Sequence, residues 1–343
     1  MIEKDNDAVG QAGIRLGTLQ NRGLTYKLAT STIDPDQYHL WAADSGVWTD
    51  VHDCLLALLR PGDTFIDAGA NIGTVTIPAA VAGVRVIAYE CAAENIRFLS
   101  AAIAANGVED RVTVCKAALW DRPGTLPFSG GSAWGRVSDS GAQRVEATTL
   151  DDDLPASQIV KVVKLDVEGA ELHVMRGMQR LIRTQHPDIV FECNPMVLAG
   201  NGSSIVDVFT FLKRFGYRIY RIYLSRRLLS PSGIPQEEAV GDYLATTRNP
   251  ILLRLQTSHR IGRMRPRHVV RKILKQDASA WPRQVQLLAV ADRMPAAVWQ
   301  VPAAAERLAQ AQRDYAGHEL LDTFRRGNFG SSEADRGIRI PKR

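Results

Sequence analysis

One stretch in the first quarter of the chain, Asp63–Gly73, constrains the fold more than any other part of the sequence. Its first residues form a short apolar strand that ends at Asp67, and Gly69 and Gly73 bracket a tight turn before a helix of small residues, Thr74–Ala82. Glycines let backbone approach a bound molecule closely, and the amino end of a helix presents free N–H groups. The pattern is typical of a ligand-binding loop between a strand and a helix.

The spacing of these glycines differs from the dinucleotide fingerprint. Gly-x-Gly-x-x-Gly places its second glycine where a pyrophosphate must fit, but that position holds Asn71 and the next glycine follows two residues later. The ligand therefore need not carry phosphates. A nucleoside with an amino-acid tail fits, because its carboxylate can face the helix end while Asp67 attracts its ammonium group. S-adenosyl-L-methionine is such a ligand, and we predict it as the cofactor.

Composition favours a globular cytoplasmic protein. The 343 residues are 45% hydrophobic and 23% charged, which allows one large domain and an appendage. No apolar run is long enough to span a bilayer, and the polar opening Met1–Gly10 is not a secretory signal. The four cysteines lie far apart, so we expect reduced thiols and no metal site: Cys54, Cys91, Cys115 and Cys193.

Strand and helix patterns alternate along the chain. We predict strands at Leu24–Thr30, Tyr38–Trp41, before Asp67, and at Val84–Glu90, Val112–Cys115, Val160–Gly169, Asp188–Cys193, Tyr217–Leu224 and Asp242–Thr246. We predict helices at Asp50–Leu59, Thr74–Ala82, Glu94–Asn106, Ala170–Thr184 and Ile205–Phe215, and a loose terminus at Met1–Gly17. Five strand-then-helix alternations predict an α/β protein with a doubly wound sheet.

The segment Trp120–Leu150 interrupts this alternation with glycine, serine and aromatic residues. It is either a β-hairpin excursion or a loop over the site, and the part around Trp134 is either a lid or plain surface.

Acidic residues lie at the carboxyl ends of the predicted strands. Glu90 follows the glycine loop by roughly 20 residues, the distance at which an acid reaches ribose hydroxyls. Ala117 lies just past the third strand and leaves space for a flat base. Asp166 and Glu168 end the fourth strand and Glu192 the fifth, so we expect these three acids in the same crevice as general-base candidates.

Each assignment has a structural alternative. The glycines could serve only the turn, Glu90 could be a surface acid, and Asp166 and Glu168 could merely cap the following helix. His173, one turn into that helix, is either a base or a partly exposed helix residue. Lys164 could act as a charge partner that opposes a raised pKa among the acids.

Five collinear elements lie between about residues 45 and 250: the loop Asp67–Gly73, Glu90 with Asn95 and Asn106 after it, Thr149-Leu150-Asp151, the run Lys164–Glu171, and Asp188–Glu192. Together they resemble the FkbM family of S-adenosylmethionine-dependent methyltransferases. The most distinctive element is Lys-x-Asp-x-Glu-Gly at 164–169.

The resemblance implies a Rossmann-like class I methyltransferase fold and, typically, O-methylation of a hydroxyl on a small molecule, sugar or lipid. Two departures are visible, since Cys91 stands where proline is usual and Thr49 where an acid is common. Neither changes a residue at the family's cofactor-binding positions, which match Asp67, Gly69, Asn71, Gly73 and Glu90.

We expect an N-terminal extension over residues 1–45, a methyltransferase domain over 46–250 and a basic helical extension over 251–343. The last part holds 18 Lys and Arg against 8 Asp and Glu, with a run without acids at His259–Lys275. That run can contact an anionic membrane surface or phosphate backbones. It can equally be a solvated linker, or pack on the acidic body. The helix Pro302–Arg326 can cover the body or pair two chains, and Ser331–Arg343 should be disordered.

Three functions remain open from the sequence. The leading one is methylation of a small-molecule or glycan hydroxyl. A nucleic-acid methyltransferase is a second reading, but the basic run lacks interleaved aromatic residues and only Asn194-Pro195 echoes a flipped-base motif. A cofactor-binding protein without catalysis is the third, and retention of every motif acid argues against it.

Overall fold

The computed structural model describes residues 13–21, 23–31, 49–130, 135–222, 230–231 and 240–248. Its strands are β1 (Ile14–Asn21), β2 (Leu24–Ser31), β3 (Thr64–Ala68), β4 (Arg85–Tyr89), β5 (Val112–Cys115), β6 (Ala118–Leu119), β7 (Gly124–Ser129), β8 (Arg136–Val137), β9 (Gln143–Thr148), β10 (Val162–Leu165), β11 (Asp188–Cys193), β12 (Arg218–Arg221), β13 (Ser230–Pro231) and β14 (Gly241–Thr246). Its helices are α2 (Thr49–Leu58), α3 (Thr76–Val81), α4 (Ala93–Asn106), α5 (Leu150–Asp153), α6 (Glu171–Arg176), α7 (Gln179–Gln185), α8 (Pro195–Gly200) and α9 (Ile205–Arg214).

Eight strands form the central sheet, in the order β13-β12-β14-β11-β10-β3-β4-β5. The five strands from β11 to β5 are parallel, and the pairs β11 with β14, β14 with β12, and β12 with β13 are antiparallel. The direction of winding reverses between β3 and β10, which is where open α/β sheets bind their ligands. The predicted Rossmann-like α/β sheet is confirmed.

The two strands at this reversal are buried along their whole length. Strands covered on both faces need near-continuous apolar residues, and each of the two strands contains one charged residue. Those exceptions, Asp67 on β3 and Lys164 on β10, are register partners. The sequence thus places one acid and one base side by side in the centre of the sheet.

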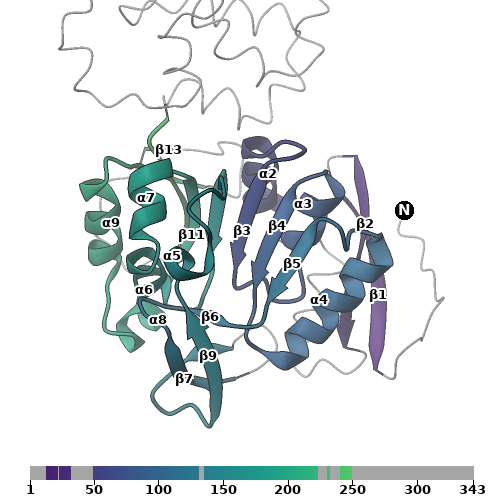
Figure 1. The fold of residues 1–343 in the computed structure, drawn as a ribbon, viewed down its shortest axis with the longest axis horizontal. Coiled ribbons are helices and arrows are strands. Elements are labelled where there is room, and N and C mark those ends of the chain that lie inside the picture. Colours follow the sequence, from purple (N-terminus) through teal and green to yellow (C-terminus); the bar gives the residue numbers. More distant parts are fainter. Residues whose placement is uncertain are drawn as a thin grey trace, which may run out of the picture. The chain divides into compact units, whose positions relative to one another are not determined.

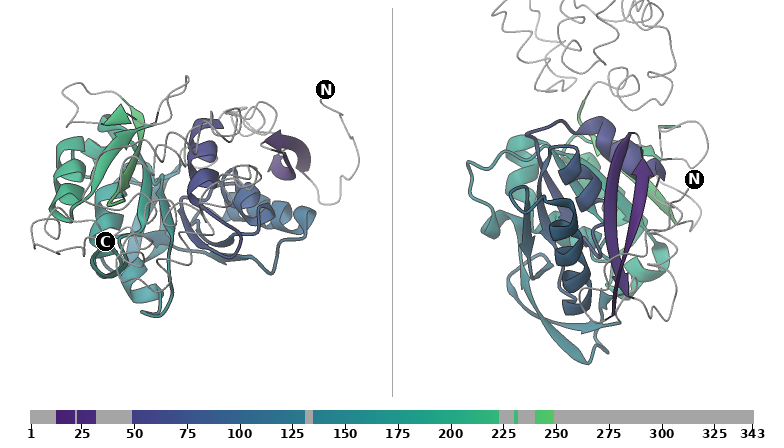
Figure 2. Two further views of the ribbon diagram at one scale, coloured as in Figure 1. Left: turned by 90° about the horizontal axis from the view of Figure 1, so that it is seen from above. Right: turned by 90° about the vertical axis from the view of Figure 1, so that its right-hand side faces the viewer.

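Helices and a hairpin cover the sheet (Figures 1 and 2). Helices α6, α7 and α9 lie near β11, while α3 and α4 pack against the hairpin β1–β2. Helix α9 begins at a capping box between Ser204 and Asp207 and presents an apolar stripe at helical spacing to the core: Ile205, Val208, Phe209 and Leu212. Among the described residues, no helix combines the length and hydrophobicity needed to cross a membrane.

The segment Trp120–Leu150 forms most of a second, four-stranded sheet in the order β6-β9-β7-β8, so the hairpin reading is confirmed. This accessory sheet lies at the end of the molecule toward which β3 and β4 point (Figure 1). A small apolar cluster joins it to the loop after β10, because Trp120 and Ala147 pack against Ala170. The accessory sheet is therefore fixed beside the carboxyl ends of the parallel strands.

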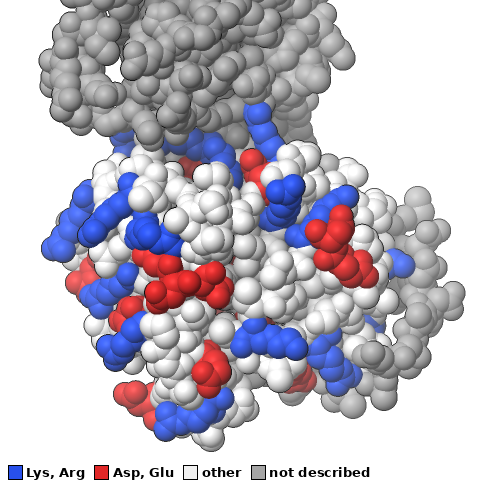
Figure 3. Space-filling model, in the orientation of Figure 1, with Lys and Arg blue, Asp and Glu red and all other residues white. Residues whose placement is uncertain are grey.

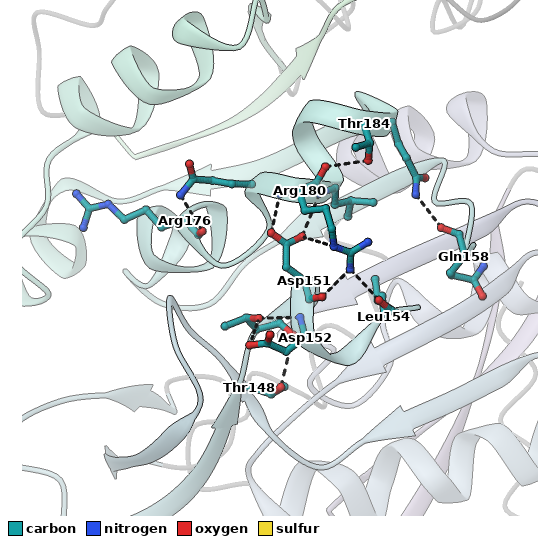
Figure 4. Close-up of polar contacts among 12 residues, drawn as sticks. Thr148, Asp151, Asp152, Leu154, Gln158, Arg176, Arg180 and Thr184 are labelled. Atoms are coloured by element: carbon teal, nitrogen blue, oxygen red, sulfur yellow. Dashed lines mark hydrogen bonds and ion pairs between the residues drawn. The ribbon is translucent and has the colours of Figure 1, made fainter. Parts of the chain in front are cut away.

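The Thr149-Leu150-Asp151 step has a structural role (Figure 4). Asp151 accepts hydrogen bonds from the backbone N–H groups of Arg180 and Leu181 at 2.6 and 3.0 Å, in the first turn of α7. The Arg180 guanidinium donates in return to the carbonyls of Asp151 and Leu154. This reciprocal contact fastens the end of the accessory sheet to α7.

Acidic and basic side chains are interspersed on the face shown in Figure 3. Acids gather there over α5, whose first turn contains three consecutive aspartates. Carboxylates are favourable at this position because they face the positive end of the helix dipole.

Two expectations for secondary structure were wrong, and one helix was not predicted. The predicted loose terminus Met1–Gly17 includes the first half of β1, which pairs with β2 along its whole length. The helix predicted over Ala170–Thr184 divides into α6 and α7 at Gly177, where a Cβ atom would lie 2.1 Å from the carbonyl oxygen of Trp120. Helix α8, which the sequence analysis did not assign, begins at Pro195 with Asn194 as its cap.

Several expectations fall outside the described residues. They are the strand at Tyr38–Trp41, the lid role of Trp134, and everything proposed for residues 251–343. These stay predictions.

Candidate active site

A cavity of about 200 Å³ opens at the carboxyl ends of β3, β4, β10 and β11. The accessory sheet supplies one wall through Phe128, Arg136 and Val137. Most of the side chains predicted to form the site line this cavity: Gly69, Asn71, Glu90, Ala117, Asp166, Glu168 and Glu192.

Gly69 allows two strand ends to meet. Its φ is +75°, and a Cβ atom there would lie 1.9 Å from the backbone oxygen of Asp166. The N–H groups of Gly69 and Ala70 both donate to the carbonyl of Tyr89, at 3.0 Å each. The glycine is therefore required by the contact between the β3 loop and the end of β10, in addition to any contact with a ligand.

Glu90 joins the loop to the end of β4. One carboxylate oxygen accepts from the N–H of Asn71 at 2.9 Å and the other from the N–H of Ala92 at 2.7 Å. Burial raises the pKa of Glu90, and these backbone donors oppose that rise. The Cys91 backbone and the Asn95 side chain also hydrogen-bond to Glu90, whose carboxylate lines the cavity wall. Asn71 supports this contact with a left-handed backbone, at φ +53°.

Asp67 and Gly73 do not line the cavity. The Asp67 side chain is fully buried, accepts from the Thr76 hydroxyl at 2.6 Å, and lies 3.4 Å from the Lys164 ammonium. A Cβ atom on Gly73 would lie 2.7 Å from the Leu99 side chain, so this glycine serves packing against α4. The expectation that Asp67 contacts a ligand ammonium is therefore wrong, because its carboxylate is enclosed and paired inside the protein.

The opposite part of the cavity is largely apolar. Ala117, Ala118 and Leu119 line it together with Phe128 and the Tyr89 ring. The Tyr89 hydroxyl is turned to the Asp153 carboxylate, and burial followed by this hydrogen bond raises the pKa of Tyr89. A flat base can lie against such a wall without leaving a polar group unpaired.

Three acids converge at the other end of the cavity. One carboxylate oxygen from each of Asp166, Glu168 and Glu192 lies within 4.8 Å of the other two. Burial, with nearby like charges after it, raises the pKa of Glu168 to about 7 and that of Glu192 to about 9. The structure thus brings together the three side chains that the sequence assigned to proton transfer.

Lys164 organises this end of the cavity. Its ammonium lies 3.1 Å from the Asp166 carboxylate and 3.4 Å from that of Asp67, and it donates to the Gly69 carbonyl at 3.4 Å. Burial would lower the pKa of Lys164, but the two carboxylates outweigh it and the pKa is raised. The ammonium is therefore permanent at neutral pH.

Other residues at the site were not assigned a role from the sequence. Asp242 on β14 lines the cavity as the register partner of Glu192, and Arg136 and Asn194 also line it. Glu171 is fully buried and accepts from the N–H groups of Val167 and Gly169, which holds the loop of Glu168. Glu171 carried a signal, since it belongs to the motif run that begins at Lys164, and Asn194 belongs to the Asn-Pro pair noted in the sequence.

His173 does not line the cavity. Its ring stacks on Trp120, with centroids 3.9 Å apart, and its nitrogens contact the Asp121 carboxylate at 2.7 Å and the Asn201 carbonyl at 3.2 Å. These contacts join the accessory sheet to α6 and the end of α8. The geometry therefore supports a structural role for His173, and not a role as a base in the cavity.

These features fit the cofactor that the sequence predicts. Glu90 presents hydroxyl acceptors, and the apolar wall suits a nucleoside base. No phosphate-binding group is needed, in keeping with Asn71 in place of the second glycine of a dinucleotide loop.

Residues 67–219 match the family model described as the methyltransferase FkbM domain. A solved methyltransferase FkbM from Methylobacillus flagellatus is 18% identical over 55% of this chain and 45% of its own, with a TM-score of 0.40. A TehB-like SAM-dependent methyltransferase from Corynebacterium glutamicum is 12% identical over 62% and 95% of the two chains, with a TM-score of 0.38. A precorrin-6y C5,15-methyltransferase from Geobacter metallireducens is 16% identical over 58% and 89%, with a TM-score of 0.35.

This chain thus spans under half of the Methylobacillus protein that it resembles. No curated protein sequence matches it.

Proposed function

We propose that this protein, whose residues 67–219 match the FkbM methyltransferase family model, methylates a hydroxyl on a small molecule, sugar or lipid, with S-adenosylmethionine as donor. When bound, S-adenosylmethionine supplies a methyl group made electrophilic by its sulfonium. The protein's share of the reaction is to hold the acceptor in line and to accept its proton.

The observation that carries the proposal is the division of one cavity into two chemically different ends. At one end Glu90 and the apolar residues 117–119 would hold the nucleoside. At the other end Asp166, Glu168 and Glu192 converge within 4.8 Å. A donor and a hydroxyl acceptor need these two environments next to each other.

Positioning accounts for most of the expected acceleration, since a well-oriented pair of reactants can gain about 7–11 kcal/mol over free encounter. A carboxylate that takes the hydroxyl proton adds about 10²–10⁴-fold. Residues of the accessory sheet enclose the cavity, so they would also exclude water from the transfer.

Calorimetry with S-adenosylhomocysteine tests the donor site. We expect micromolar binding to the wild type, about −8 kcal/mol. Glu90→Ala should lose at least about 1.5 kcal/mol, roughly tenfold in Kd, because it removes the hydroxyl acceptors and frees the Asn71 loop. The matched control is Glu94→Ala, an exposed acid in the first turn of α4, which should bind as the wild type does.

Equal affinities for the wild type and Glu90→Ala would remove Glu90 from the site. No binding to the wild type would overturn the proposed donor.

A further inference from the structure

The three converging acids Asp166, Glu168 and Glu192 differ in their surroundings although they lie close together. Resting on the proposed function, we infer that they divide the work: Asp166 is the charge partner of Lys164, Glu192 is a neutral hydrogen-bond donor, and Glu168 takes the proton from the acceptor. Geometry supports each assignment separately.

Asp166 is committed to Lys164. The two groups are 3.1 Å apart, and the ammonium is enclosed with only 8% of the side chain exposed. The second carboxylate on this ammonium, Asp67, is fully buried. A buried ammonium needs such partners away from water. Asp166 is therefore held in place as one of the two charge partners of Lys164.

Glu192 has acids on both neighbouring strands. Asp242 of β14 is its direct register partner, and side chains of directly opposed residues lie on the same face of a sheet. On the other side, Leu165 of β10 is the register partner of Phe191, so the next residue, Asp166, lies beside Glu192 of β11. Glu168 and the buried Glu171 add further negative charge, and burial is the largest cause of the raised pKa of Glu192. A proton is the simplest compensation, so Glu192 is a carboxylic acid at neutral pH.

Glu168 has a cation of the accessory sheet in the same cavity. It lies on the loop after β10 with a left-handed backbone, φ +52°, which turns it away from the strand direction. Arg136 of the accessory sheet lines the same cavity, and its charge opposes the rise that burial and Asp166 cause in the pKa of Glu168. Lys164 acts in the same direction. The resulting pKa of about 7 suits a general base, which must be ionised yet basic at working pH.

The transfer then balances as follows. The acceptor oxygen forms a bond to the methyl carbon as its O–H bond breaks, and the proton passes to a carboxylate oxygen of Glu168 and later to solvent. The electron pair of the broken carbon–sulfur bond stays on sulfur, which becomes a neutral thioether. Glu192 keeps its proton and donates a hydrogen bond that orients the acceptor.

Arg136 and Lys164 are positioning residues in this scheme, because they act on the acceptor only through the acids. Arg136 is the informative one to change, since it is exposed and lies on a different sheet. Replacing it alters the charge facing Glu168 without removing a core contact.

The test is a pH titration of the full-length, ligand-free protein by NMR of isotope-labelled glutamate carboxyl carbons. We expect one midpoint near 7 that vanishes in Glu168→Gln and a higher one that vanishes in Glu192→Gln. Arg136→Gln should raise the Glu168 midpoint by at least about half a unit, and Arg136→Lys should restore it.

The inference is overturned if Glu192 titrates below Glu168, or if Arg136→Gln leaves the Glu168 midpoint in place. It is also overturned if both midpoints lie at the ordinary value for glutamate. Binding of S-adenosylhomocysteine is measured separately on the same samples. If the protein does not bind S-adenosylhomocysteine, the proposed function is refuted. If it binds normally but Glu192 titrates below Glu168, only the division of roles is refuted.

Discussion

Replacing Gly69 by alanine should destabilise the protein much more than the same change at Gly107. Both glycines have positive φ, +75° and +60°, so both variants bear the cost of a left-handed alanine, about 1–2 kcal/mol. At Gly107 a Cβ atom meets nothing within 4 Å. At Gly69 it would lie 1.9 Å from the Asp166 carbonyl oxygen, which belongs to the backbone and cannot rotate away.

The added cost follows from that overlap. Overpacked interiors typically lose about 1–3 kcal/mol, so Gly69→Ala should cost about 2–5 kcal/mol in total. For a protein of this size each kcal/mol lowers Tm by about 2–4 °C. The strand end must also move, and with it the contacts of Asp166 and Lys164. Gly69→Ala should therefore bind S-adenosylhomocysteine more weakly than the wild type. Gly107→Ala should bind it with the wild-type affinity.

Thermal unfolding and calorimetry on the two variants check this reasoning. An equal loss of Tm would show that φ, and not the contact between the strand ends, makes glycine necessary at position 69. A destabilised Gly69→Ala with unchanged ligand affinity would separate the loop's packing from its role in binding.

Further predictions concern single contacts and pH. Asp151→Ala should lower the free energy of unfolding by about 1–2 kcal/mol, because two N–H groups at the start of α7 lose their acceptor. Glu109→Ala, which changes an exposed acid, should stay within about 0.5 kcal/mol by urea titration. The pKa of His52 is lowered to about 4, first by burial and then by the charge of Lys164, so His52 binds a proton more readily in the unfolded state. The free energy of unfolding should therefore fall by about 3 kcal/mol as the pH drops from 6.5 to 4. His52→Gln should reduce this dependence on pH. The pKa of Glu192 is raised, so the folded state binds this proton more tightly than the unfolded state does. Stability should therefore decline as the pH rises from about 5 toward 9. Tm of Glu192→Gln should decline less over the same range.

Much of the site followed from the sequence because of one property of parallel sheets. Their carboxyl ends all lie at one edge, so residues that follow successive strands meet there whatever the details of packing. Glu90, Ala117, Asp166, Glu168 and Glu192 line one cavity for this reason. The glycine loop carried a second signal, since its spacing differs from that of a pyrophosphate-binding loop.

The direction of a side chain within that edge was not predictable in the same way. Asp67 ends its strand as the other acids do, yet it is register partner to Lys164 and is fully buried. Register depends on which strands become neighbours, and β3 and β10 are almost a hundred positions apart in the chain. The same holds for Gly177, whose helix break comes from the approach of Trp120.

The parallel sheet, the glycine loop and the set of acids at the strand ends could be predicted from the chain, because local periodicity indicates the elements and their order. Which acid faces which charge depends on how the elements pack. Asp242 and Arg136 reach the cavity from β14 and from a separate sheet, and burial among these neighbours sets the different proton affinities of Glu168 and Glu192. Electrostatic surroundings depend on distances in space, which no spacing in sequence specifies.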